Sequence, residues 1–262
     1  MNFINAQKTS LIIPDKWIHS PVITTSDHHG EWHKLKDKIY HLELKDCIII
    51  SCGDLGVGFA SRQQSYALFE ALDVWFANRN ILFLGIRGNH DDPQYFDGSI
   101  NLSNFKLIPD YTYSTIQGKR WGFVGGAISI DRCDRVKNVS YWEDEAFILR
   151  EDLIQPCDVL VTHSVPWWLG PYDKQGIKYW LDKEKSTNKY NHNKPFYPDF
   201  YDKDLWEECK KERQDISELI RLSKCKQSYH GHMHLFAQVE QGGCLARIID
   251  ILEFVEYREF IP

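Results

Sequence analysis

Residues 47–54 have the sequence CIIISCGD, and residues 81–92 have the sequence ILFLGIRGNHDD. Each stretch opens with a continuous apolar run, which is typical of a strand buried on both faces, and closes with small and polar residues. Between the two runs, Ser61 can cap a helix that continues to about Asn78. A strand, a helix and a second strand in this order predict a parallel sheet in an α/β protein.

The same alternation continues on both sides of this unit. On its N-terminal side we expect a strand at residues 21–25 and a helix at residues 32–42. The C-terminal half is richer in strands, which we expect at residues 111–116, 121–128, 157–162, 227–230, 235–240, 244–249 and 252–257. We expect helices there at residues 140–152 and 205–223.

One long segment, residues 166–204, shows neither helical nor strand periodicity and is rich in Trp, Tyr and Phe. We therefore predict a single domain over residues 1–262 with an aromatic-rich excursion at about 166–204. So many aromatic residues disfavour disorder, and a long connection in a compact domain is usually functional. The excursion is either a packed element with a small core of its own or a lid or dimer surface over a functional site.

Composition and charge restrict the functional class. The chain has 262 residues, of which 43% are hydrophobic and 26% are charged, as in ordinary soluble globular proteins. The net charge of −6 disfavours a broad nucleic-acid binder, and no apolar run approaches the ~20 residues of a membrane-spanning helix. Seven cysteines without a CxxC pair predict reduced thiols in a cytoplasmic protein.

Five short polar motifs each follow a predicted strand. They are Asp27-His28-His29-Gly30, Gly53-Asp54, Gly88-Asn89-His90-Asp91, Thr162-His163-Ser164-Val165-Pro166 and Gly231-His232-Met233-His234. Sites in an open α/β sheet form beyond the carboxyl ends of the strands, so we expect the motifs to converge at one rim. Their carboxylate, amide and imidazole groups suit divalent Mn, Fe, Zn, Co or Ni, with Mn the first choice in vitro.

The motifs contain enough ligands for two metal ions if one carboxylate is shared, and Asp54 is the candidate for that bridge. The predicted ligands are Asp27, His29, Asp54, Asn89, His163, His232 and His234. Two cations held ~3.5–4 Å apart can share a water, lower its pKa towards ~7 and neutralise phosphoryl charge. The resulting hydroxide would attack phosphorus in line, and His90 would be left for proton transfer to the leaving oxygen.

The motifs resemble those of the calcineurin-like metallophosphoesterase superfamily, whose pattern is D-x-H, G-D, G-N-H-[DE], a histidine in a G/T-H-x-P-like segment, and G-H-x-H. The matching residues run from Asp27 to His234, which is nearly the whole chain. The resemblance implies an α/β fold with a sandwich of two mixed β-sheets flanked by helices (α/β/β/α) and a dinuclear site. One metal would take Asp27, His29, Asp54 and His234, and the other Asp54, Asn89, His163 and His232. His90 would match the catalytic histidine, and residues 124–145 further resemble a bacterial and phage subgroup.

The chain departs from the protein Ser/Thr phosphatase branch of that superfamily, which has G-D-x-x-D-R-G at its second motif. Here residues 53–58 read GDLGVG, so the second Asp and the Arg are missing. Arg132 and Arg135 are candidates for the phosphate-binding arginine, because guanidinium can bind phosphate with two hydrogen bonds. The alternative for both is a salt bridge to the acidic cluster at residues 143–145. His28 has either a supporting or substrate-binding role or an ordinary loop position.

These residues predict a dinuclear metal-dependent hydrolase of phosphomonoesters or phosphodiesters. Its substrate would be a small phosphoester or a phosphorylated macromolecule, with no membrane involved and the oligomeric state left open. A nuclease with the same dinuclear site is the first alternative, although a net charge of −6 disfavours nucleic acid. A non-catalytic binding scaffold is the second alternative, although such scaffolds tend to lose ligands and here every ligand position is filled.

Overall fold

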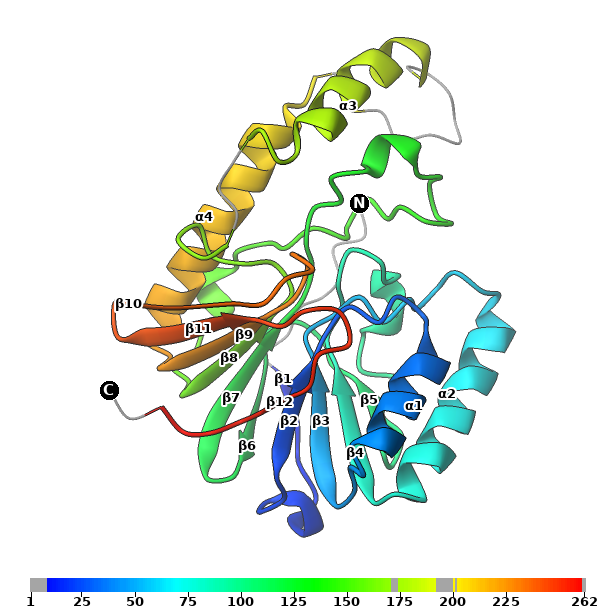
Figure 1. Ribbon diagram of the computed structural model, residues 1–262, viewed down its shortest axis with the longest axis vertical. Coiled ribbons are helices and arrows are strands. Elements are labelled where there is room, and N and C mark those ends of the chain that lie inside the picture. The colour runs from blue at the N-terminus through cyan, green and yellow to red at the C-terminus, as the bar shows by residue number, and fades with distance from the viewer. Residues whose placement is uncertain (1–8, 171–173, 192–199, 201, 261–262) are drawn as a thin grey trace.

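Two β-sheets pack face to face in the computed structural model, which describes residues 9–170, 174–191, 200 and 202–260 (Figure 1). The smaller sheet has five strands in the order β12-β2-β3-β4-β5. The strands β2 (Val22–Thr25), β3 (Cys47–Ser51), β4 (Ile81–Gly85) and β5 (Phe105–Leu107) run parallel, and β12 (Val255–Glu256) pairs antiparallel with β2. The parallel unit predicted around residues 47–92 is therefore confirmed.

The larger sheet has seven strands in the order β1-β6-β7-β8-β9-β11-β10. Their bounds are Thr9–Ser10 (β1), Thr112–Ile116 (β6), Lys119–Val124 (β7), Val159–Thr162 (β8), Gln227–His230 (β9), Ala237–Gln241 (β10) and Cys244–Ile248 (β11). The pairs β6–β7 and β10–β11 are antiparallel hairpins, whereas β7, β8, β9 and β11 run parallel. Both sheets are therefore mixed.

The strand β3 shows why its sequence lacks alternation. Ile48 and Ile50 face the second sheet and pack in the core between the sheets, together with Trp121 and Phe123 of β7. Ile49 faces the other way and packs under the helices that cover the smaller sheet. Because both faces of the strand are buried, both sets of side chains must be apolar.

Two helices cover the outer face of the smaller sheet, α1 (Trp32–His41) and α2 (Arg62–Ala77). The start of α2 is fixed by a capping box, in which Ser61 and Gln64 satisfy each other's backbone amides. The outer face of the larger sheet is covered by α4 (Leu205–Ser223), whose Ile216 and Leu219 are fully buried (Figure 1). The layers are thus α/β/β/α, as the resemblance implied.

The predicted helix at residues 140–152 is wrong. This segment runs irregularly and ends in a 3-10 helix, η4 (Glu151–Leu153). The buried guanidinium of Arg87 donates to the carbonyl oxygens of Asp144, Glu145 and Ala146 at 3.1, 2.6 and 3.2 Å. Those carbonyls would be acceptors within a helix, so the arginine replaces the helical hydrogen bonds. The predicted strand at 121–128 likewise ends at Val124, before a glycine pair that passes over Arg87.

Part of the predicted excursion is helical: α3 (Lys178–Asn191) lies beyond the ends of the sheets, near the top of Figure 1. Leu181 and Glu184 are its buried residues among those whose side chains are described, so the helix has no apolar stripe for the sequence to reveal. Residues 171–173, 192–199 and 201 of the excursion lie outside the described residues. Further 3-10 helices are η1 (Asp15–Trp17), η2 (Pro93–Tyr95) and η3 (Arg132–Asp134). Within the described ranges, no helix has the length and apolar character needed to cross a membrane.

Candidate metal centre

The polar motifs converge where β2, β3, β4, β8 and β9 end, at one rim of the sandwich. Backbone hydrogen bonds join the first two loops, because the amide of Asp27 donates to the carbonyl of Gly53 at 3.1 Å and that of His29 to Asp54 at 2.8 Å. This rim lies at the carboxyl ends of parallel strands, which is where the sequence predicted a site.

The four residues predicted for one metal lie together. Each of Asp27, His29, Asp54 and His234 offers a ligand atom, and these atoms all lie within 4.8 Å of one another. The Nε2 atoms of His29 and His234 are 3.1 Å apart, and His234 Nε2 is 3.3 Å from Asp27 Oδ1. Such a group of carboxylate oxygens and imidazole nitrogens matches the ligand chemistry of a divalent transition metal.

The second set of predicted ligands gathers on the other side of Asp54. The Nε2 of His163 lies 3.2 Å from Asp54 Oδ1 and 3.1 Å from Asn89 Oδ1. The ring of His232 lies beside that of His163, with centroids 5.1 Å apart. The Nδ1 of His163 lies 2.7 Å from the carbonyl oxygen of Cys52, to which it can donate, so Nε2 can present a lone pair to a metal.

The carboxylate of Asp54 lies between the two clusters. Its Oδ1 faces His163 at 3.2 Å, and its Oδ2 faces Nδ1 of His29 at 3.7 Å. One oxygen is thus directed to each cluster, which is the arrangement that a shared ligand requires. The donor set and its placement therefore fit divalent cation binding at this rim.

Two glycines of the motifs are required by close approach. A Cβ on Gly88 would lie 2.0 Å from Asp54 Oδ1 and 2.4 Å from the Asp54 backbone nitrogen. A Cβ on Gly231 would lie 2.0 Å from Ser26 Oγ and 2.5 Å from Asp27 Oδ2. The glycine before each polar pair lets a second loop reach the carboxylates.

The backbone of the site is strained. Positive φ angles, between 44° and 69°, occur at the predicted ligands Asp27, His29, Asp54, His232 and His234. Each such conformation costs a non-glycine residue about 1–3 kcal/mol and persists only where surrounding contacts impose it. The amide of His232, for example, donates to both carboxylate oxygens of Asp27 at 3.1 Å. The contacts that hold the ligands together also maintain this strain.

In the metal-free site, the pKa values of Asp54 and His163 show that a protonated histidine supplies the positive charge that a metal cation would supply. Burial would raise the pKa of Asp54, but the facing His163 holds it well below its usual range. Burial also opposes a charge on His163, yet the carboxylates of Asp54 and Asp27 raise its pKa to about 9. A proton on His163 thus neutralises Asp54 in the metal-free chain.

His90 lies at the edge of the site, with Nε2 3.9 Å from Asp54 Oδ2. The guanidinium of Arg135 lies 2.8 Å from the same Nε2, and it is held by Asp131 at 2.7 Å and by the carbonyl of Asn89 at 3.1 Å. Burial lowers the pKa of His90 to about 4, against the attraction of Asp54 and with the help of the Arg135 charge. Arg135 is therefore at the site, and His90 is neutral in this arrangement.

The other two predicted substrate residues lie elsewhere. Arg132 is buried and donates to Glu184 of α3 at 2.8 and 3.0 Å and to Glu208 of α4 at 2.5 Å, so its salt bridges are not with residues 143–145. His28 packs against Trp32 with ring centroids 4.3 Å apart, and burial lowers its pKa to about 3. Neither side chain is among the residues that line the cavity beside the site, which favours the alternatives of a salt bridge for Arg132 and a packed position for His28.

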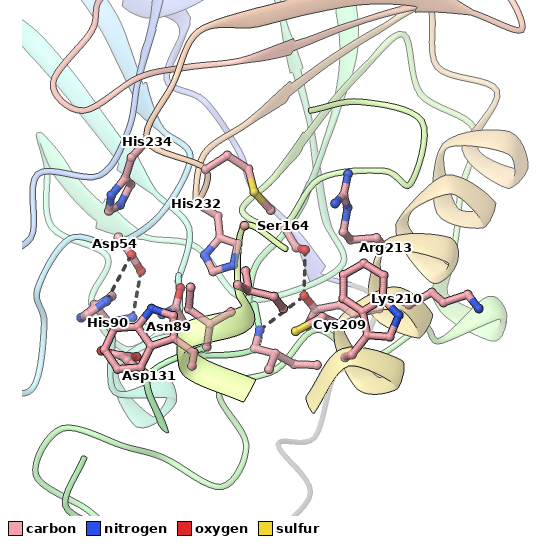
Figure 2. Close-up of a pocket in the computed structure, with 18 of the residues that line it drawn as sticks. Asp54, Asn89, His90, Asp131, Ser164, Cys209, Lys210, Arg213, His232 and His234 are labelled. Atoms are coloured by element: carbon pink, nitrogen blue, oxygen red, sulfur yellow. Dashed lines mark hydrogen bonds and ion pairs between the residues drawn. The ribbon is translucent and has the colours of Figure 1, made fainter. Parts of the chain in front are cut away.

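A cavity of about 430 Å³ opens beside the predicted ligands. Figure 2 shows Asp54, Asn89, His90 and His234 on one side of it, and Cys209, Lys210 and Arg213 of α4 on the other. Residues of the aromatic-rich excursion, among them Trp167 and Trp180, form part of its wall. The excursion thus borders the candidate metal centre.

Further residues support the ligands. The hydroxyl of Ser129 accepts from Asn89 Nδ2 at 3.1 Å, which turns the Asn89 oxygen towards His163. Asp91 of the G-N-H-D motif was predicted to support a ligand histidine, but its buried carboxyl accepts instead from the amides of Gly88, Leu55 and Val57 at 2.7, 3.1 and 3.0 Å and so joins two motif loops. The sequence holds no signal for Ser129 or the Cys52 carbonyl.

Comparisons with known proteins bear on the family of the chain. The chain is similar to a solved structure described as GAP50, the anchor in the inner membrane complex of Plasmodium, with 11% sequence identity, a TM-score of 0.39, and coverage of 88% of this chain and 71% of that one. A likeness this distant carries no argument about function. Among curated proteins, no match to the sequence is found. The family model for calcineurin-like phosphoesterases matches residues 20–236, and the chain belongs to that family.

Proposed function

We propose that the chain hydrolyses phosphomonoesters or phosphodiesters with two divalent metal ions that share Asp54. The observation that carries the proposal is the placement of the Asp54 carboxylate, with one oxygen 3.2 Å from His163 and the other 3.7 Å from His29. Membership of the calcineurin-like phosphoesterase family supports phosphoester hydrolysis as the reaction.

The ions, when bound, would supply a water of lowered pKa as nucleophile and neutralise charge on the phosphoryl oxygens. The chain's own contribution is to hold the ligand atoms in fixed orientations. Ser129 orients the amide of Asn89, and the Cys52 carbonyl orients the ring of His163. Such supporting hydrogen bonds restrict the ligands before a metal arrives and raise their affinity for it.

Arg135 and His90 have linked roles in this proposal. A guanidinium has no acceptor, so at 2.8 Å it donates to His90 Nε2, and the neutral ring holds its proton on Nδ1. A phosphoryl oxygen is a stronger acceptor for guanidinium than imidazole is, so substrate binding would draw Arg135 to the phosphoryl group. His90 Nε2 would then be free to take a proton from the attacking water and pass it to the leaving oxygen.

The cavity volume of about 430 Å³ and the net charge of −6 favour a small phosphoester over a nucleic-acid strand. Every predicted ligand position is filled by a residue that can bind a metal, which favours an enzyme over a binding scaffold. All seven cysteines are free thiols, which supports a reducing, cytoplasmic setting.

The test compares initial rates on the monoester and the diester of the same nitrophenol, after chelation and after Mn²⁺ is restored. A rate that disappears with the metal and returns with it supports the proposal. A preference for the monoester indicates a phosphatase, and a preference for the diester favours the nuclease alternative. No rate on either ester from protein with two bound ions contradicts the enzymatic proposal and supports the scaffold.

A further inference from the structure

The cavity beside the candidate metal centre has two unlike ends. One end contains the predicted ligands Asp54, Asn89, His232 and His234. The other end is bordered by α4, with Cys209, Lys210 and Arg213 (Figure 2), and the wall of the cavity also contains the apolar residues Ile128, Ile130, Ile177, Trp180, Trp206 and Met233. A phosphoryl group at the first end would place its ester substituent in the second.

These apolar side chains of the wall are only half-buried, although they lie in a concave site. Apolar surface left in contact with water costs about 25 cal/mol per Å², and an apolar ligand that covers it recovers this free energy. In the core between the sheets, by contrast, apolar side chains such as Ile48 and Phe123 are fully buried. The half-buried apolar side chains of the wall therefore suit the binding of an apolar ligand.

The kind of apolar group follows from the wall. Trp167, Trp180 and Trp206 present three indole rings, and those of Trp167 and Trp206 are 6.2 Å apart in an edge-to-face arrangement. Flat rings pack against indole with a geometric preference that a flexible alkyl chain does not share. A volume of about 430 Å³ matches a small molecule rather than a macromolecule.

We propose that this cavity binds the leaving group of the substrate, and that this group carries a flat aromatic or heteroaromatic ring, as in an aryl phosphate or a nucleotide. This inference rests on the proposed function, because it takes the phosphoryl end of the substrate to lie at the metal centre. Trp180 is the specificity-determining residue, since it comes from α3 in the excursion and lines the cavity.

The test measures KM on the Mn²⁺-loaded protein for 1-naphthyl phosphate, adenosine 5′-monophosphate, n-octyl phosphate and glycerol 2-phosphate. The variants are Trp180→Leu and Trp180→Phe, with Lys185→Ala as the control because Lys185 is an exposed residue of the same helix, α3. Comparing each variant with wild type on the same ester cancels the intrinsic reactivity of that ester.

We expect Trp180→Leu to raise KM for naphthyl phosphate about 5-fold more than KM for glycerol 2-phosphate, with a smaller change in Trp180→Phe. Equal changes for both esters would overturn the inference, and so would an equal change for octyl phosphate, which would mark the wall as merely apolar. If Trp180→Leu also selectively raises KM for adenosine 5′-monophosphate, the cavity is a nucleoside site. If KM for this nucleotide does not change selectively, the leaving group is the aryl group of an aryl phosphate.

A second measurement separates this inference from the proposed function. Calorimetric binding of 1-naphthyl phosphate to the metal-free chain, compared with glycerol 2-phosphate, reports the cavity without catalysis. Binding of the naphthyl ester that weakens in Trp180→Leu, together with no turnover of any ester, would retain the cavity and reject the enzyme. Turnover of the esters without any preference for the aromatic ring would retain the proposed enzyme and reject the proposed ring-binding cavity.

Discussion

The guanidinium of Arg135 lies 2.8 Å from Nε2 of His90, the histidine of the G-N-H-D motif. In the protein Ser/Thr phosphatase branch, the G-D-x-x-D-R-G motif supplies an aspartate and an arginine that are missing from residues 53–58 of this chain. Here an arginine from the loop after η3 contacts the histidine instead, and Asp131 holds that arginine at 2.7 Å. The two side chains therefore form a hydrogen-bonded pair at the edge of the candidate metal centre.

His90→Ala and Arg135→Ala should each lower kcat while metal content stays near that of the wild type. Loss of proton transfer costs about 10²- to 10⁴-fold in rate, so we expect His90→Ala to fall in this range. Because the residues act together, the double variant should be little slower than His90→Ala alone. The measurement is a double-mutant cycle in kcat on the nitrophenyl monoester, with bound metal determined in parallel.

Additive losses in this cycle would show that Arg135 and His90 act independently. Loss of bound metal in His90→Ala would make His90 a structural residue. Thermal unfolding of each variant controls for misfolding, since Arg135 also donates to the carbonyls of Asn89 and Ser140.

Gly88→Ala should weaken metal binding. The added methyl group would lie 2.0 Å from Asp54 Oδ1, so the carboxylate or its loop must move. We expect Kd for Mn²⁺ to rise about 10- to 100-fold, as when a group that orients a ligand is lost. Gly118→Ala is the control, because its φ of +69° is strained but nothing lies within 4 Å of the added methyl. Equal metal affinity in the two variants would show that the space beside Asp54 is not needed.

Glu212→Gln should change the pH dependence of stability. Glu212 is buried on α4, accepts from Ser164 Oγ at 2.7 Å, and has a pKa raised to about 7, chiefly by burial. A raised carboxyl pKa means that the folded chain holds a proton that the unfolded chain loses above about 4.5. The contribution to stability is therefore complete below pH 4.5 and disappears as the pH rises through 7.

The wild-type free energy of unfolding should thus fall, relative to Glu212→Gln, by an amount on the order of 2–3 kcal/mol between pH 4.5 and pH 8. Denaturant unfolding of the metal-free proteins at several pH values measures this difference. Glu207 is an exposed residue of the same helix, so the free energy of unfolding of Glu207→Gln should have the same pH dependence as that of the wild type. A pH-independent difference for Glu212→Gln would contradict the raised pKa.

Local patterns predicted much of the fold because they report burial and capping directly. The strand at 47–51 has the predicted bounds, since a strand buried on both faces needs a continuous apolar run. The helix at 205–223 also has the predicted bounds, because the side chain of Asp204 accepts from the amides of Trp206 and Glu207 and so caps the start of the helix. The segment 140–152 was mispredicted because its carbonyls bond to Arg87, a contact 57–59 residues away in the sequence.

The candidate metal centre likewise contains residues that local sequence patterns predicted and contacts that they could not predict. The ligand motifs were recognisable because each places its ligand residues within a few positions of one another, directly after a strand. The link between Arg135 and His90 was not, because it depends on the path of the loop after β7 across the rim. Arg132, only three residues earlier, faces Glu184 instead, and nothing in the sequence distinguishes the two arginines.

The most direct test of the central claim is the number of Mn²⁺ ions bound per chain, measured by calorimetric titration of metal-free protein. The account predicts two ions for the wild type, weakened binding of both in Asp54→Asn, and wild-type binding in Asp37→Asn, an exposed control. A single ion in the wild type would contradict the account, and so would two ions bound to Asp54→Asn with unchanged affinity.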